Sequence, residues 1–271
     1  MRRGAPHFLL VMKQWLGREW RSFLHAVRSL DVQTACVLIL CALFVIGQFK
    51  LGSRGFFRSH VAPNADELLS WGWWFGMQGM TGFLLPAATL LLFFRRRPSE
   101  IGLGTGDWKL ACSVGVLFAP IVAAGAWVLS DGAAFQAEYP HYRPAVQDWE
   151  LFFLYHLLFL FYWIGWEYLW RGFLLFGTAH TLGVYAIFVQ AMPFALLHLR
   201  KPAPELMLSI VGGLALGALV WRCRSFWIAV PIHAMQMFAI DFWCSLRLRT
   251  GVSGIGPDAL LSLLKTWLGD A

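Results

Sequence analysis

Charged side chains are scarce in this sequence. Asp, Glu, Lys and Arg make up 14% of its 271 residues, whereas 58% are hydrophobic and the mean hydropathy is +0.59. A soluble domain usually has about a quarter of its residues charged. Too few polar side chains therefore remain to cover a water-facing surface, which excludes a soluble enzyme, a nucleic-acid-binding domain and a disordered tail.

Charge is absent from several long stretches of the chain, and a bilayer-spanning helix needs about 20 apolar residues. We predict spans at about 33–50, 68–94, 110–130, 150–170, 181–199, 206–221 and 225–244. The short segment 258–268 is either an interfacial helix or half of an eighth span. The expected fold is therefore all-α, a polytopic transmembrane helix bundle of about seven to eight helices, with one multi-pass membrane domain over residues 31–271.

The first 30 residues differ from the rest because they mix apolar and basic side chains. Segment 8–28 combines Leu, Phe and Trp with four basic residues: Lys13, Arg18, Arg21 and Arg28. The apolar region of a cleavable signal peptide does not carry charge at that density. At helical spacing the large apolar side chains fall broadly on one side, which favours an amphipathic helix in the cytoplasmic interface. A polar leader to the first span is the alternative.

Basic residues are unevenly distributed between the loops. Residues 1–30 contain six Lys and Arg and loop 95–109 contains four, whereas loop 131–149 has only Arg143. Positive-inside reasoning predicts a cytoplasmic N-terminus and an external 131–149 loop. We expect a multi-pass protein of the bacterial inner membrane. The aromatic and proline-rich part of that loop, 136–144, either caps a site from outside or is an ordinary ordered turn.

Several common signatures are missing. The five cysteines form no Cys-x-x-Cys pair and are odd in number, so we interpret them as packing residues and not as a disulfide framework. The chain also has no His-Glu-x-x-His, Gly-x-Ser-x-Gly or phosphate-binding Gly-Lys-Thr motif. Any chemistry must therefore come from ionisable residues within the apolar stretches.

Two opposite charges interrupt the apolar stretch 151–199. Glu167 and Arg171 are four residues apart, so on a helix they share a face and neutralise each other. An ionisable residue inside a membrane span is costly and by default indicates a functional site. The alternative is an ion pair that only locks two helices together.

Histidines and one further carboxylate lie in the later spans. His198 ends the fifth span, His233 lies within the last, and Asp241 follows His233 by eight residues on roughly the same helix face. With span four running inward and span five outward, Glu167 is expected in the inner third and His198 near the outer end. A helix break at Pro193 or near Gly165 would bring the two level.

One carboxylate and two imidazoles are a useful chemical set. The carboxylate of Glu167 can take a proton from water, while His198 and His233 hold that water or stabilise an oxyanion. Glu plus two His is also a catalytic zinc-ligand set. The residues alone leave both alternatives open.

Three short motifs occur in order along the chain. They are Trp166-Glu167-x-x-x-Arg171, Phe194-x-x-x-His198 and His233-x-x-x-Met237. The chain resembles the CAAX-protease and bacteriocin-processing (CPBP, or Abi) family of glutamic-type intramembrane proteases. That family has Glu-Glu-x-x-x-Arg, Phe-x-x-x-His and His-x-x-x-Asn on successive transmembrane helices. The resemblance covers about 100–245 and implies a protease-like core there.

The motifs depart from the family pattern at two positions. Trp166 replaces the first Glu of the first motif and Met237 replaces the Asn of the third. Gln236 and Asp241 are the polar residues nearest to Met237 that are candidates to substitute for the Asn. A single Glu in the first motif resembles the sorting-type branch, such as the myxosortases, which cleave C-terminal anchor signals of surface proteins.

The resemblance implies an intramembrane endopeptidase that acts on a membrane-anchored protein or peptide in the bilayer. Glu167 would activate water, His198 position it, His233 stabilise the oxyanion and Arg171 orient Glu167, with Phe194 in support. No cofactor is expected, with zinc at Glu167, His198 and His233 as the alternative. A catalytically degenerate family member that acts as a membrane scaffold, partner-binding or immunity protein is the other interpretation. The sequence assigns no oligomeric state.

Overall fold

The computed structural model describes residues 5–270, and all secondary-structure elements of these residues are helices, joined by loops. The α-helices are α1 Ala5–Arg28, α2 Val32–Lys50, α3 Arg54–Phe56, α4 Glu67–Gly79, α5 Leu85–Ala88, α6 Trp108–Leu129, α7 Ala133–Glu138, α8 Trp149–Glu167, α9 Leu175–Leu182, α10 Ala186–Leu196, α11 Ala203–Cys223, α12 Ala229–Thr250 and α13 Pro257–Asp270. Wider π-helical turns are Phe57–Val61, Met80–Leu84, Thr89–Phe93 and Tyr168–Leu174, and 3-10 turns are Pro98–Ile101, Arg143–Val146 and Gly183–Tyr185. The predicted all-α class is confirmed.

Five stretches among the described residues are long and apolar enough to cross a membrane. They are Val32–Lys50, Glu67–Phe93, Trp108–Leu129, Trp149–Leu196 and Ala203–Cys223. The fourth has 48 residues and turns back at Gly183–Tyr185, so it contains two passes. α12 is as long as a span but carries Asp241 and Arg247. With α12 included, these helices correspond in order to the predicted passes.

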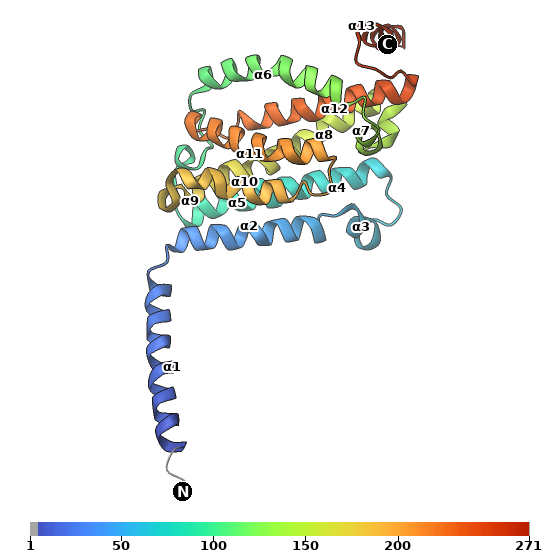
Figure 1. Cartoon of the computed structure of the whole chain (residues 1–271). Helices are drawn as coiled ribbons and strands as arrows, with labels where there is room; N and C mark the ends of the chain where they lie inside the picture. The colour runs from blue at the N-terminus through green and yellow to red at the C-terminus, as the bar shows by residue number, and fades with distance from the viewer. Residues whose placement is uncertain (1–4, 271) are drawn as a thin grey trace.

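The long helices lie side by side and alternate in direction (Figure 1). We call the end at which α2 begins the α1 end. It also holds loop 94–107 and the start of α12, joined by hydrogen bonds from the Asp107 amide to the Cys223 carbonyl and from the Phe226 amide to the Gly102 carbonyl. The opposite end, the α7 end, holds loops 51–66 and 130–148. α1 leaves the bundle crosswise to α2, and α13 lies beyond the α7 end.

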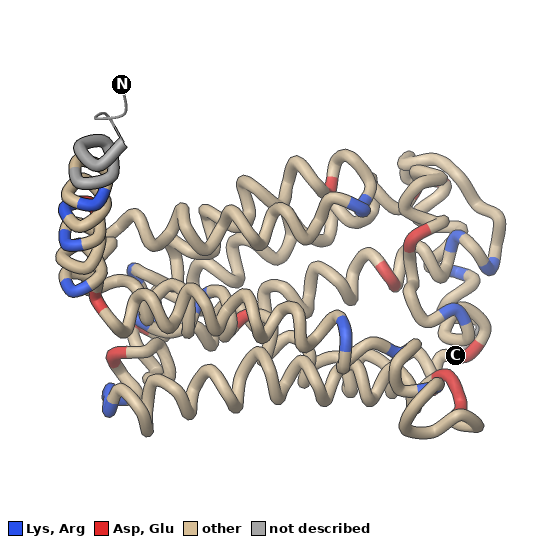
Figure 2. The backbone as a smooth tube through the Cα atoms, turned by 90° about the horizontal axis from the view of Figure 1, so that it is seen from below, with Lys and Arg blue, Asp and Glu red and all other residues tan. Residues whose placement is uncertain are grey.

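Aspartates begin several of the long helices. The side chains of Asp31, Asp66, Asp107 and Asp148 accept the backbone N–H three residues later. Such caps satisfy amides that a helix start leaves without partners. Lys, Arg, Asp and Glu gather at both ends of the bundle and on α1, with few between (Figure 2). Charge therefore marks the helix ends, as expected where spans meet a water interface.

The polarity of the bundle is inverted relative to that of a soluble protein. Large apolar side chains such as Phe93, Val116 and Leu117 are more than 70% exposed on its outside. Glu167 and Arg171 are fully buried inside. This arrangement fits a lipid environment, in which polar groups face the bundle interior.

Two glycines allow α8 to approach the α4–α5 segment closely. A Cβ at Gly165 would lie 2.1 Å from the carbonyl oxygen of Gln78, and one at Gly82 would lie 2.4 Å from the carbonyl oxygen of Gly165. Small residues at such crossings let transmembrane helices pack backbone to backbone. This contact fixes α8 just before Glu167.

The fifth predicted span differs most from its expected length. Its helix, α10, covers only Ala186–Leu196 of the predicted 181–199. A helix of eleven residues rises about 16 Å, roughly half of the hydrocarbon thickness. Pro193 lies within α10, and the turn 197–202 completes the pass.

Candidate active site

Glu167 is the last residue of α8, and Arg171 lies in the π-helical turn that follows. Both side chains are fully buried, and Arg171 Nη1 lies 3.1 Å from each carboxylate oxygen of Glu167. The ion pair expected from the four-residue spacing is therefore present. π-Helical turns are rare and frequently occur at functional sites, and this one positions Arg171 beside Glu167.

His233 supplies the second partner of Glu167. It lies near the start of α12, and its Nδ1 is 2.5 Å from Glu167 Oε1. Its ring packs against that of Trp163, with 4.2 Å between the centroids. Glu167 Oε2 is buried without an aligned hydrogen bond to any described residue. One carboxylate oxygen thus contacts His233, whereas the other has only the ion-pair contact with Arg171.

Phe194 joins the cation to the two histidines. The Arg171 guanidinium lies 4.1 Å above the ring of Phe194. The same ring lies 4.7 Å from the imidazole of His198 and 6.0 Å from that of His233. The ring of Trp166 also contacts Phe194 and His198. All three motifs therefore meet at one place.

The tautomer of His198 follows from its hydrogen bond. Nδ1 lies 2.7 Å from the Phe194 carbonyl, which can only accept, so Nδ1 carries the proton. In the neutral ring Nε2 is then an acceptor. The short α10 brings His198 level with Trp166, the neighbour of Glu167. The difference in depth expected from straight spans is thus absent.

Asp241 lies away from Glu167 and faces a different histidine. Its Oδ2 is 3.4 Å from Nε2 of His156 on α8, and the carboxylate is fully buried. His156 precedes Glu167 by eleven residues, or about 16 Å along the helix axis. Gln236 is half-buried and makes no hydrogen bond to a described residue. Met237 packs against the apolar core, and no hydrogen bond joins Gln236 or Asp241 to Glu167.

A polar cluster at the α7 end is centred on Lys201, which lies three residues after His198 in the chain. Lys201 Nζ lies 2.8 Å from Glu138, 3.0 Å from the hydroxyl of Tyr139 and 2.9 Å from Nε2 of His141. The Tyr139 hydroxyl also bonds to Glu205 at the start of α11. Loop 130–148 therefore folds onto the turn that carries His198. Sequence reasoning singled out this loop as a possible cap but missed Lys201, and the only signal was its closeness to His198.

Charge and burial set the protonation of this cluster. Burial and the neighbouring Lys201 lower the pKa of His141 to about 4. Burial alone would raise the pKa of Glu138, but the hydrogen bond and charge of Lys201 outweigh it, so that pKa is lowered. At neutral pH, His141 is neutral and accepts from Lys201, while Glu138 is ionised. The contacts of Lys201 with ionised Glu138 and neutral His141 are therefore both formed at neutral pH.

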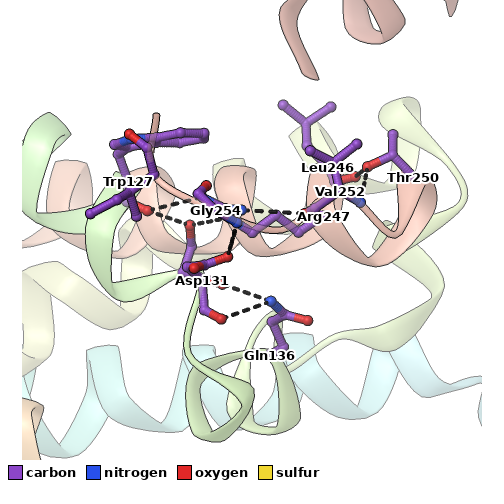
Figure 3. A network of polar contacts seen from close by, with 10 residues as sticks. Trp127, Asp131, Gln136, Leu246, Arg247, Thr250, Val252 and Gly254 are labelled. Carbon is purple, nitrogen blue, oxygen red and sulfur yellow. Dashed lines mark hydrogen bonds and ion pairs between the residues drawn. The ribbon is translucent and has the colours of Figure 1, made fainter. Parts of the chain in front are cut away.

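Arg247 of α12 binds the start of loop 130–148 (Figure 3). Its guanidinium donates to Asp131 at 2.9 Å, to the Ser130 hydroxyl at 2.9 Å and to the Gly254 carbonyl at 3.0 Å. It also lies 4.3 Å above the ring of Trp127. A buried arginine with this many partners holds α6, α12 and the turn before α13 together.

The His, Cys, Asp and Glu side chains of the site are the ones that could hold a metal ion. Among residues 5–270 no three His, Cys, Asp or Glu side chains are grouped so that they could hold a metal ion. His233 contacts Glu167 directly, and the ring of Phe194 contacts the imidazoles of both His198 and His233. The arrangement in this structure does not fit the alternative in which Glu167, His198 and His233 together bind zinc.

Comparison with known proteins supports one family. The family model described as "Type II CAAX prenyl endopeptidase Rce1-like" matches residues 148–239. No curated protein and no solved structure matches the chain. The matched segment contains Glu167, Arg171, Phe194, His198 and His233.

Proposed function

Because the CAAX endopeptidase family model matches residues 148–239, the segment that contains the three motifs, we propose that this protein is a glutamic-type intramembrane endopeptidase. It hydrolyses a peptide bond in or near the membrane anchor of a protein substrate. The observation that carries the proposal is the fully buried Glu167 carboxylate. Arg171 and His233 hold it, and one of its oxygens is free of hydrogen bonds.

Glu167 is the general base in this mechanism. Its Oε2 accepts a proton from a water molecule, which attacks the scissile carbonyl carbon. Arg171 and His233 fix the carboxylate through Oε1, so Oε2 keeps one orientation. Arg171 also places a positive charge beside the buried carboxylate.

His233 stabilises the oxyanion that this attack creates. Its Nδ1 is engaged by Glu167, so only Nε2 is available to the substrate. With both ring nitrogens carrying a proton, His233 donates from Nδ1–H to Glu167 Oε1 and from Nε2–H to the developing oxyanion. The water proton stays on Oε2 of Glu167 during this step.

His198 positions the attacking water. The Phe194 carbonyl holds Nδ1–H, so Nε2 of the neutral ring accepts a hydrogen bond from water. The ring of Phe194 contacts the imidazoles of His198 and His233 and packs against the guanidinium of Arg171. It is therefore a positioning residue.

The proposed substrate is a membrane-anchored protein, and the single Glu in the first motif favours sorting-type processing of a C-terminal anchor. We place the protein in a bacterial inner membrane with its N-terminus in the cytoplasm. The α7 end then faces outward, and the loop tied to Lys201 covers the site from that side.

The proposed test identifies the uncleaved substrate. Deletion of the gene should cause one membrane protein to accumulate with its anchor intact, and the wild-type gene should restore cleavage. Glu167→Gln should reduce cleavage by roughly 10²–10⁴-fold, the usual contribution of a general base. Glu150→Gln, an exposed change on the same helix, is the matched control and should cleave normally.

A metal-independent mechanism is proposed because Glu167 acts on water directly. Purified protein should keep its activity after exhaustive chelation. Loss of activity with chelator and its recovery with zinc would give Glu167, His198 and His233 ligand roles in an arrangement different from the one described above.

One observation favours the scaffold alternative. The Trp166 ring packs against Phe194 and His198, at the position where the family has its first Glu. A scaffold, partner-binding or immunity protein should keep its phenotype in a folded Glu167→Gln variant. That result would end the protease proposal.

A further inference from the structure

A cavity of about 270 Å³ opens at the α1 end, outside the candidate active site. Residues from α2, loop 94–107, α9 and the end of α11 line it. They include Gln33, Arg96, Glu100, Phe176, Trp221 and Arg224. Two of these side chains are arginines, which the proposed protease chemistry does not use.

Arg96 is held in place from one side. Its Nε donates to Gln33 Oε1 at 2.7 Å, and the buried Gln33 in turn donates from Nε2 to the Gly177 carbonyl at 2.7 Å. The two terminal nitrogens of Arg96 have no hydrogen-bond partner among the described residues. The guanidinium is therefore oriented in advance, with its forked end available to an acceptor.

Arg224 approaches the same cavity from α11. It caps that helix with φ +57°, and its guanidinium lies 5.1 Å from the centre of the Phe176 ring. No described carboxylate pairs with it. The one carboxylate in the lining, Glu100, binds the amide of Arg97 at 2.8 Å and lies 3.6 Å from its guanidinium. Two cations thus face one cavity without a counter-ion of their own.

The position of this cavity matches the headgroup region of a bilayer. It lies where several helices end, and α1 leaves the bundle there, crosswise to α2 (Figure 1). The cavity residue His180 contacts Asp31, the residue that caps α2 directly after α1, at 2.9 Å. α1 exposes large apolar side chains such as Trp15 and Trp20 beside its basic residues, which is typical of a helix in the membrane surface.

We propose that this cavity binds the phosphate group of an anionic phospholipid. The forked end of Arg96 and the guanidinium of Arg224 donate to the phosphate oxygens, since arginine matches phosphate geometry with paired N–H donors. The aromatic side of the cavity, Phe176 and Trp221, lies against the glycerol and the start of the acyl chains. A bound lipid would supply the missing negative charge and tie α2, α9 and α11 together at this end.

The test measures lipid retention by the full-length protein in detergent, using native mass spectrometry. The probes are phosphatidylglycerol, phosphatidylcholine and inorganic phosphate. Wild type should retain phosphatidylglycerol at least about tenfold better than the double variant Arg96→Gln/Arg224→Gln, which loses two donors and two charges. The matched control, Arg95→Gln/Lys109→Gln, removes two exposed charges at the same end and should retain the lipid like wild type.

The other outcomes decide against the proposal. Equal retention of phosphatidylglycerol by wild type and the arginine variant would overturn it, as would equal loss in the control. Tight binding of inorganic phosphate with no lipid retained would assign the cavity to a free anion. If the double Gln variant does not fold, Arg96→Lys/Arg224→Lys keeps the charge but removes the fork, and unchanged retention in that variant contradicts forked recognition.

Discussion

The Glu167 carboxylate is fully buried in the bundle, and two neighbours contact it. Arg171 supplies the opposite charge, and Nδ1 of His233 lies 2.5 Å from its Oε1. The second buried carboxylate, Asp241, has only His156 at 3.4 Å. The two carboxylate–imidazole pairs bridge the same helices, α8 and α12. Only the first lies beside the other family motifs.

Removal of Arg171 alone should lower the free energy of unfolding more than removal of both members of the ion pair. Arg171→Met leaves Glu167 buried without a cation and should destabilise the fold by about 3–5 kcal/mol. The double variant Glu167→Gln/Arg171→Met removes the stranded charge and should recover much of that loss. Thermal unfolding in detergent measures both variants. An equal loss of stability in the two would show that the charge of Glu167 is not what Arg171 compensates.

At the scale of single elements, the crossing of α8 and α4–α5 depends on a backbone contact. Gly165→Ala would place a methyl group 2.1 Å from the Gln78 carbonyl, so the helices must separate. Overpacking of this kind costs about 1–3 kcal/mol. Because Glu167 lies two residues further on, cleavage should fall as well.

Gly125→Ala in α6 is the matched control for that change. Nothing lies within 4 Å of the Cβ it adds, and alanine favours a helix over glycine. Its thermal midpoint should stay the same or rise slightly. Equal midpoints for Gly165→Ala and Gly125→Ala would contradict the proposed role of the close crossing.

The loop at the α7 end should loosen in acid. His141 protonates at about 4 when it is held in the loop but near 6.5 when it is free, so the contribution of its neutral form is lost as the pH falls from about 6.5 to about 4. Glu138 also loses its stabilising contribution to the loop as the pH falls below its ordinary pKa of 4.5. The reason is that its lowered pKa means that the ionised form stabilises the loop.

Hydrogen exchange of residues 133–146 tests this, after correction for the intrinsic effect of pH. Protection should decrease between pH 7 and pH 4.5 in the wild type. His141→Gln cannot titrate, so protection in this variant should change little over the same range. A parallel decrease in both proteins would assign the effect to some other group.

At the scale of the whole molecule, the two ends differ in basic residues and should face different compartments. A cysteine at Gln147 of the α7 end should react with a membrane-impermeant reagent in intact cells, in a Cys112→Ser background. A cysteine at Ser99 of the α1 end should react only after permeabilisation. Both positions are exposed. The reverse pattern would invert the topology and place the arginine cavity at the outer surface.

The sequence by itself determined the features that depend on local periodicity. The charge-free stretches predicted the helical passes, because about 20 apolar residues are needed to cross a bilayer. The four-residue spacing predicted that Arg171 would meet Glu167, because neighbours on a helix face are set within one turn. The three motifs were sufficient to recognise the family that the comparison supports.

Only the tertiary structure decided which residues meet between helices. His233 contacts Glu167 directly, His198 is reached through Phe194, and Asp241 faces His156. The depth of His198 depends on the short α10, and Lys201 joins the turn after His198 to Glu138 and His141 of the 130–148 loop. These contacts are set by helix length, breaks and close crossings, which bring together residues far apart in the chain, and no local spacing in the sequence encodes them.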